Sequence, residues 1–139
     1  MSIRKIRVLL VEDDEISAQA ARTMLERLGC RVDTASTGGE AIELFGKEIY
    51  DLILMDWQMP QMDGLETTAR LRRMPQGRVT PIVGTTASMS RLECLAAGMN
   101  DVIPKPFLFG TLKMGLRKWT LWEENYKSGS GSLCGGLTN

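Results

Sequence analysis

Hydrophobic residues are distributed along the chain in two alternating patterns. Short, nearly continuous apolar runs predict β-strands, because a strand covered on both faces of a sheet buries almost every side chain. The expected strands are residues 6–11, 31–35, 51–56, 81–86 and 101–104. Between and after them, apolar residues recur at steps of three and four, the spacing that places side chains on one face of a helix. The pattern therefore predicts five strands and five helices.

Each predicted helix carries an apolar stripe. The stripes are Ile16, Ala20, Met24 and Leu28; Ala41, Ile42, Leu44 and Phe45; Leu65, Ala69 and Leu71; Leu92, Leu95, Ala96 and Met99; and Leu108, Leu112 and Leu116. Gly29, Gly46 and Gly98 stand where helices are expected to end, and Pro75 closes the third helix. This alternation predicts an α/β fold, a flavodoxin-like, doubly wound parallel sheet in the order 2-1-3-4-5.

Acidic residues follow two strands that should be neighbours. In a doubly wound sheet, ligands bind beyond the carboxyl ends of the strands, where the strand order reverses. Glu12, Asp13 and Asp14 follow the first strand, and Asp56 ends the third. These carboxylates should converge and repel one another unless a cation lies between them. Oxygen ligands without His or Cys favour Mg²⁺.

Asp56 is also a candidate nucleophile, because a carboxylate beside Mg²⁺ can attack phosphorus and form an aspartyl phosphate. Such a phosphoryl group needs positive charge and donors around it, which Lys105 and Thr86 at the ends of strands five and four could supply. Each residue alone has an ordinary alternative. Surface acids and Lys105 can be solvated charges, and Thr86 a strand residue or helix cap. Asp63 is expected to cap the third helix.

Composition narrows the possible functions. The 139 residues, 43% of them apolar, suit one compact domain, and the 17 basic residues balance 17 acidic ones. Direct nucleic-acid binding is therefore not expected. No apolar run approaches the length of a membrane span, and no membrane partner is expected. The sequence has no histidine, which excludes His-based general-base catalysis and most zinc sites.

The three cysteines and the tail complete the organisation. The cysteines are far apart and form no metal-binding pattern, so a reduced, cytoplasmic setting is expected, with Cys30 and Cys94 in the core. Residues 5–126 should form one domain. Residues 127–139, rich in Gly and Ser, are expected to be a disordered linker or a remnant of cloning, with Cys134 exposed.

Four motifs in register give the chain a family resemblance. They are VEDD (11–14), DLILMDWQMPQMDG (51–64), TTA (85–87) and KPF (105–107). Together they resemble the response-regulator receiver domain of bacterial two-component signalling, over about residues 5–120. The stretch CLAAGMND (94–101) further resembles receivers attached to hybrid sensor histidine kinases.

The resemblance implies a set of site residues. They are Asp56 as phosphoacceptor, Lys105 and Thr86 as its phosphate-contacting partners, and Glu12, Asp13, Asp56 and the backbone carbonyl of Gln58 as Mg²⁺ ligands. Gln58 and Ser88 flank the position of an attacking water and would tune the lifetime of the acyl phosphate. The resemblance also implies that the Lys105–Pro106 peptide bond is cis.

The function implied by the resemblance is a phosphorylation switch. The chain would take its phosphoryl group from a histidine kinase or histidine phosphotransfer protein and change its affinity for an unknown downstream partner. It would be a signalling domain, not an enzyme, although it would assist its own phosphotransfer and slow autodephosphorylation. The output face would comprise the fourth helix, fifth strand and fifth helix of a monomer or weak dimer.

The sequence departs from the family pattern in three places. Val102 stands where an aromatic residue is frequent, so the inward swing of that ring cannot operate. Pro104 directly precedes Lys105, which an edge strand tolerates. Trp119, Trp122 and Tyr126 extend the last helix beyond its usual end, and they are expected to pack on the domain's own last helix or to form a dimer contact or the stub of a signalling helix.

Other functions stay open or are disfavoured. Trp57, directly after the acceptor, is either a packing residue or a contact for the donor protein. A pseudo-receiver that binds partners without phosphorylation is the alternative function, which Val102 leaves open. An aspartyl phosphatase of the haloacid-dehalogenase type needs a second aspartate where this chain has Gln58. A P-loop enzyme is excluded, because the sequence contains no GxxxxGK[ST] motif.

Overall fold

The predicted sheet is present in the computed structural model of the chain. The model describes residues 5–56, 63–86 and 91–123. Within these ranges, parallel strands form one five-stranded sheet in the order β2-β1-β3-β4-β5, which confirms the flavodoxin-like, doubly wound prediction. The strands are β1 (Arg7–Val11), β2 (Arg31–Ala35), β3 (Leu52–Asp56), β4 (Ile82–Thr86) and β5 (Asp101–Pro104).

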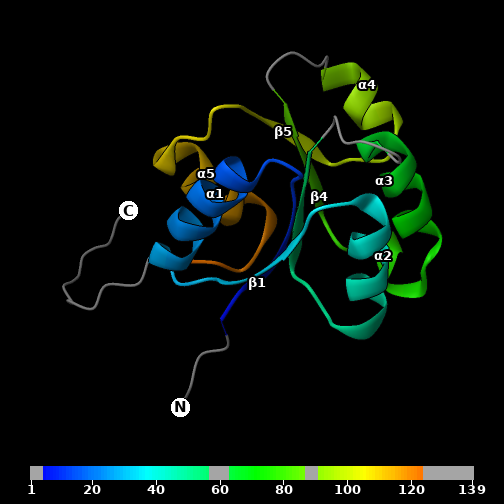
Figure 1. Cartoon of the computed structure of the whole chain (residues 1–139), viewed down its shortest axis with the longest axis horizontal. Helices are drawn as coiled ribbons and strands as arrows, with labels where there is room; N and C mark the ends of the chain where they lie inside the picture. The colour runs from blue at the N-terminus through cyan, green and yellow to red at the C-terminus, as the bar shows by residue number, and fades with distance from the viewer. Residues whose placement is uncertain (1–4, 57–62, 87–90, 124–139) are drawn as a thin grey trace.

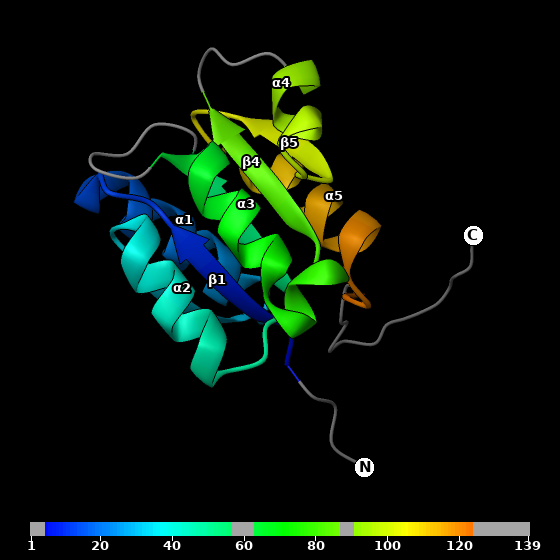
Figure 2. The same cartoon turned by 90° about the vertical axis from the view of Figure 1, so that its right-hand side faces the viewer.

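Helices cover both faces of this sheet. Figure 1 shows α1 and α5 on one side and α2, α3 and α4 on the other, and Figure 2 shows β1 and β4 running in the same direction. The helices are α1 (Glu15–Arg27), α2 (Gly38–Lys47), α3 (Gly64–Arg73), α4 (Arg91–Ala96) and α5 (Phe109–Trp119), with a 3₁₀ turn at Pro75–Arg78. Because all five strands run parallel to one another, their carboxyl ends lie at the same edge of the sheet.

The central strands divide their side chains between two cores. Val8 and Leu10 of β1 lie in the core beneath α1 and α5, whereas Leu9 and Val11 lie in the core beneath α2, α3 and α4. All five residues of β3 are buried. Two covered faces are the reason that these strands appear in the sequence as continuous apolar runs.

Cys30 and Cys94 are buried, unpaired thiols, as the sequence predicts. Burial raises the pKa of Cys30 to about 12, with a smaller contribution from the negative charge of Asp51. Burial also raises the pKa of Cys94. Both residues therefore behave as small core side chains rather than nucleophiles.

Half of the predicted stripe of α1 is wrong, since Met24 and Leu28 do pack against the core beneath α1 and α5 but the other two members do not. Ile16 is 81% exposed and Ala20 is exposed, whereas Ala21 and Leu25 are fully buried. Steps of four residues advance by more than a full helical turn, about 40° per step, so a stripe defined only by such steps does not stay on one face, and its first two members lie off the buried face. Alternating steps of three and four from Ala18 stay on it.

The predicted stripe of α4 is also corrected. Leu92 is 76% exposed and Leu95 37% exposed, whereas Met99 is buried, as predicted, and so is Cys94, which the predicted stripe omits. A Cβ at Gly84 of β4 would lie 2.7 Å from Met99 Sδ and 3.3 Å from Cys94 Sγ. The absence of a side chain at Gly84 therefore lets these two sulfur-containing residues pack onto the strand.

Two of the three predicted glycine helix ends are correct. Gly29 (φ 89°) and Gly98 (φ 109°) take the left-handed conformation after α1 and α4, as expected for helix C-termini. Gly46 instead lies inside α2, which continues to Lys47. Pro75 follows directly after the last helical turn of α3 and its C-cap, Met74, as predicted.

The predicted extension of the last helix is wrong. Helix α5 ends at Trp119, and Thr120 is extended with φ −136°. The Thr120 hydroxyl donates to the Leu116 carbonyl at 2.6 Å and accepts from the Trp122 amide at 3.0 Å. These side-chain bonds offer the backbone an alternative to another helical turn. Tyr126 lies outside the described residues.

Trp122 returns to the domain after this turn. Its side chain is only 8% exposed and belongs to the core beneath α1 and α5. The indole Nε1 donates to the Leu28 carbonyl at the end of α1, at 2.7 Å. Trp122 thus contacts the domain's own α1 rather than continuing α5.

We predict that Trp122→Ala lowers the free energy of unfolding by about 2 to 3 kcal/mol, because it removes buried apolar area and leaves a cavity. Trp122→Phe should cost about 1 kcal/mol, mainly the indole hydrogen bond. Leu121, 88% exposed, is the matched control, and Leu121→Ala should change stability by less than about 0.5 kcal/mol. Urea unfolding measures all three; equal losses for Trp122→Ala and Leu121→Ala would contradict the packing role.

Candidate functional site

The predicted site residues meet at the carboxyl edge of the sheet. Asp56 is the last residue of β3 and Thr86 the last of β4, and Lys105 follows β5. Glu12 follows β1, and its amide donates to the Ala35 carbonyl at 2.9 Å, which continues the strand pairing by one residue. Strands β1 and β3 are neighbours at the reversal of strand order, the position where doubly wound sheets bind ligands.

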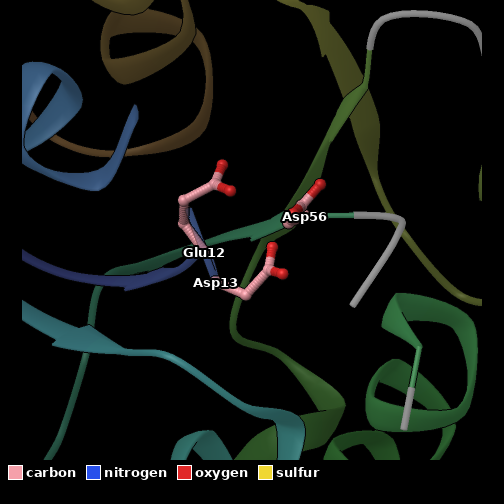
Figure 3. Close-up of side chains that lie close together, drawn as sticks. All are labelled: Glu12, Asp13 and Asp56. Carbon is pink, nitrogen blue, oxygen red and sulfur yellow. The ribbon is translucent and has the colours of Figure 1, made fainter. Parts of the chain in front are cut away.

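Three carboxylates form a compact cluster at this edge. One oxygen from each of Glu12, Asp13 and Asp56 lies within 4.8 Å of the other two. Figure 3 shows Glu12 and Asp13 leaving the end of one strand and Asp56 leaving the neighbouring strand, with the three side chains around a common space. Glu12 and Asp56 are buried, whereas Asp13 is exposed. The structure thus brings together three of the four acids that the sequence predicted to converge.

Asp14, the third consecutive acid, does not join this cluster of described residues. It is the N-cap of α1, and its carboxylate accepts a hydrogen bond from the Ser17 amide at 2.8 Å. Asp63 caps α3 in the same way by accepting from the Glu66 amide at 2.9 Å, as predicted. Aspartate is among the preferred N-caps because its oxygen satisfies an amide that the helix leaves free.

Lys105 neutralises part of the cluster. Its Nζ lies 2.5 Å from Glu12 Oε1, an ionic contact without hydrogen-bond geometry. The same ammonium donates a hydrogen bond to Asp56 Oδ1 at 3.3 Å. The backbone holds this residue in place, because the Lys105 amide donates to the Thr86 carbonyl at 2.9 Å. The Lys105–Pro106 bond is cis, as expected.

The electrostatics of the site centre on Asp56. Burial raises the pKa of its carboxyl to about 7, the negative charge of Glu12 adds to the rise, and Lys105 opposes it. Burial would lower the pKa of Lys105, but its close contacts with Glu12 and Asp56 and their negative charges outweigh burial and raise it. Asp56 therefore carries a fractional charge near neutral pH that depends on its neighbours.

The donor set fits a hard divalent cation. Its members offer only carboxylate oxygens, which Mg²⁺ prefers, and they come from two strand ends that the fold holds side by side. Three ionised carboxylates with one ammonium leave two negative charges. A divalent ion would remove the repulsion that raises the pKa of Asp56.

Thr86 and Val102 lie beside this centre. Thr86 is buried and pairs in register with Pro104. Strand β5 is an edge strand, so the missing Pro104 amide is tolerated, as predicted. Val102 is half-buried and packs against the core beneath α2, α3 and α4.

Three predicted residues, Trp57, Gln58 and Ser88, lie outside the described residues. Sequence reasoning missed two contacts, the ion pair between Lys105 and Glu12 and the hydrogen bond from the Asp14 amide to Glu12 Oε2 at 3.1 Å. The run of consecutive acids was the only signal for the second contact, and it does not reveal which acid turns toward the helix.

The fold and the site together define a doubly wound domain with an acidic centre and a lysine at its strand-order reversal. The chain belongs to the response-regulator receiver family, because the family model "Response regulator receiver domain" matches residues 8–117. Receiver domains act in two-component and phosphorelay signalling and are signalling domains rather than conventional enzymes.

Individual relatives agree with this assignment. The aerobic respiration control sensor protein ArcB of Escherichia coli K12 is 41% identical over 126 residues, covering 88% of this chain and 16% of ArcB. The receiver domain of the sensor histidine kinase PA1611 from Pseudomonas aeruginosa PAO1 has a TM-score of 0.79 at 37% identity, covering 84% of this chain and 98% of that one. That structure holds a magnesium ion in its active site cleft.

A third relative comes from a complex of two proteins. A chain of the Saccharomyces cerevisiae complex between the histidine phosphotransfer protein Ypd1 and the receiver domain of Ssk1 has a TM-score of 0.78 at 26% identity, covering 92% of this chain and 97% of that one. The present chain spans 16% of the length of ArcB. No helix among the described residues is both long and apolar enough to cross a membrane.

We predict that Asp56→Asn stabilises the metal-free protein by about 1 to 2 kcal/mol at about pH 8. The raised pKa means that the fold prefers the protonated carboxyl, so the wild-type protein loses stability as the pH rises from about 4 to about 7, and the loss is complete above about pH 7. The advantage of the variant should shrink at about pH 5, where wild-type Asp56 is protonated in the folded state. Urea unfolding in the presence of a chelator tests this, and a pH-independent difference would contradict it.

Proposed function

We propose that the chain is a phosphorylation-switched signalling receiver that accepts a phosphoryl group on Asp56 from a phosphohistidine donor. The observation that carries this proposal is the position of Asp56 at the end of β3, beside Glu12 and Asp13 and bonded to Lys105. A buried carboxylate among other acids and a cation is the arrangement expected of a metal-assisted nucleophile.

Each residue has a chemical role in this proposal. Glu12, Asp13, Asp56 and the Gln58 carbonyl would hold Mg²⁺, which supplies positive charge to the transferring phosphoryl oxygens. An Asp56 oxygen attacks phosphorus in line; a P–O bond forms, the P–N bond to the donor's imidazole breaks, and the imidazole nitrogen keeps that electron pair. Lys105 pairs with the new phosphate oxygens.

Thr86 would convert phosphorylation into a conformational change. Its hydroxyl moves toward the phosphoryl group, and the chain between β4 and α4 follows, shifting the populations of two loop states. Val102 cannot add the swing of an aromatic ring. Slow autodephosphorylation ends the signal, at a rate that Gln58 and Ser88 set.

Helix α4, strand β5 and helix α5 form the proposed output face. They are already connected through Asp101, which accepts hydrogen bonds from Arg91 at 2.5 Å, Lys118 at 3.1 Å and Trp119 Nε1 at 2.9 Å. Burial would raise the pKa of Asp101, but hydrogen bonds from Trp119, the Val102 amide, Arg91 and Lys118 hold it well below its usual range. A displacement of α4 would therefore reach α5.

The proposed donor is a histidine kinase or a histidine phosphotransfer protein. The Ypd1–Ssk1 complex and the likeness to ArcB support this class of partner. The two unpaired buried cysteines support a cytoplasmic setting. The balanced charge supports a protein partner for the output rather than nucleic acid, with the domain itself a monomer or a weak dimer.

A pseudo-receiver is the second candidate function, and Val102 is the observation that favours it. A domain without the aromatic relay could bind a partner in the same way with and without phosphate. The complete set of Glu12, Asp56 and Lys105 favours the phosphorylated receiver instead, because a pure binding module has no need to bury two carboxylates beside each other.

We predict that acetyl phosphate with Mg²⁺ adds one phosphoryl group to the wild-type chain and none to Asp56→Asn, because only the carboxylate is a nucleophile. Intact-mass spectrometry detects the adduct, and omission of Mg²⁺ should abolish it. A wild-type chain that stays unmodified while a known receiver reacts in parallel would favour the pseudo-receiver.

We further predict that the donor protein contacts Ile16, which is 81% exposed in the first turn of α1, next to the acid cluster. Ile16→Glu should slow transfer from a phosphorylated histidine phosphotransfer protein by at least about tenfold, because it places a charge in a contact that excludes water. A panel that includes Ypd1 supplies the donor. Phosphorylation by acetyl phosphate should be unchanged.

Ile49 provides the matched control for this test. It is 73% exposed and precedes β3, at the opposite edge of the sheet. Ile49→Glu should leave both reactions at wild-type rates. Equal slowing of the protein and acetyl phosphate reactions in Ile16→Glu would mean that the substitution damages the site rather than donor binding.

A further inference from the structure

Asp14 uses all three of its polar groups at the junction between β1 and α1. Its carboxylate accepts from the Ser17 amide at 2.8 Å, and its carbonyl accepts from the Ala18 amide at 2.9 Å. Its own amide donates to Glu12 Oε2 at 3.1 Å. The first two bonds begin the helix, and the third holds a carboxylate of the acid cluster. Asp14 thus connects the start of α1 to the candidate metal site.

The conformation that caps the helix also places this amide. Asp14 is extended, with φ −83° and ψ 116°, which is usual for an N-cap whose side chain reaches forward to the first turn. In that conformation its N–H points back at Glu12. A residue that cannot cap leaves the turn free to adopt other conformations, and the amide then loses its fixed direction.

Glu12 is held from two sides as a result. The Asp14 amide contacts Oε2, and the Lys105 ammonium lies 2.5 Å from Oε1. The Glu12 side chain is almost fully buried, so no bulk water competes for these positions. Hydrogen bonds that orient a metal ligand typically contribute about 10- to 100-fold in metal affinity.

We propose that Asp14 is a positioning residue for the binding of a divalent cation, acting through its helix cap on the orientation of Glu12. This inference rests on the proposed function, in which Glu12 helps to hold Mg²⁺. The Asp14 carboxylate points to Ser17 and lies outside the acid cluster of described residues. Its role is therefore to fix the turn, not to supply charge to the ion.

The test compares Asp14→Ala with Asp14→Asn and Asp14→Ser. Asparagine and serine cap helices without a negative charge, whereas alanine does not cap. Isothermal titration calorimetry with MgCl₂ at constant ionic strength gives the dissociation constant of each variant. We expect Asp14→Ala to raise it about tenfold, and both capping variants to stay within about twofold of wild type.

Thr37 supplies a control for the loss of a cap as such. It is the N-cap of α2, and its hydroxyl accepts from the Glu40 amide at 3.0 Å. Thr37→Ala should lower the urea midpoint about as much as Asp14→Ala does and leave the Mg²⁺ dissociation constant unchanged.

Three outcomes would overturn the inference. If Asp14→Asn and Asp14→Ser bind Mg²⁺ as weakly as Asp14→Ala, the effect is due to the lost charge. If Thr37→Ala also binds Mg²⁺ more weakly than wild type, the effect is due to general destabilisation. Wild-type affinity in Asp14→Ala would show that the cap does not position Glu12. A wild-type chain that binds no Mg²⁺ at all would instead overturn the proposed function, and this inference with it.

Discussion

Mutual repulsion among carboxylates at adjacent strand ends is the constraint on which the rest of this structure depends. Glu12 and Asp56 are both buried, with oxygens within 4.8 Å of each other and of Asp13. Burial raises the pKa of Asp56 to about 7, and the negative charge of Glu12 contributes to the rise. Burying two carboxylates so close together lowers the stability of the folded protein. It is favourable for a site whose carboxylate must meet a cation and then a phosphoryl group.

The fold supplies the forces that hold this arrangement together. Two apolar cores fix β1 and β3 from both faces, so their ends cannot move apart to relieve the repulsion. Lys105 spans the two buried acids from the far end of β5, and its amide is bonded to the β4 terminus. The interactions that hold the sheet together therefore also hold the site together, and they involve the ends of β1, β3, β4 and β5.

The same supports connect the site to the rest of the domain. Thr86, which carries the carbonyl that holds Lys105, also ends the strand that leads toward α4. Farther from the site, the Asp101 carboxylate joins α4 to α5, because it accepts hydrogen bonds from Arg91 of α4 and Trp119 of α5. Val102 has no aromatic ring whose inward swing could carry the signal. In the proposed switch, movement of the backbone after Thr86 thus has to carry the signal.

Sequence alone determined the strands, their order and the two strand ends at which the acids cluster. Continuous apolar runs, turn residues and the position of Asp56 at a strand end are local signals, and parallel topology has few alternatives. The faces of α1 and α4 were misplaced, because a short stripe of similar residues does not fix the helix rotation until it packs. Gly84, for example, admits Cys94 beside the predicted Met99, whereas Leu92 and Leu95 remain exposed.

Tertiary structure alone decided where side chains turn at the ends of these elements. The first three acids of the acidic run divide into two cluster members and one helix cap, since Asp14 accepts from the Ser17 amide while Glu12 and Asp13 lie close to Asp56. Trp122 leaves the helical periodicity because the Leu28 carbonyl and a core position lie within its reach. Both choices depend on partners distant in sequence or on the rotation of a backbone turn, which the local pattern of residues does not specify.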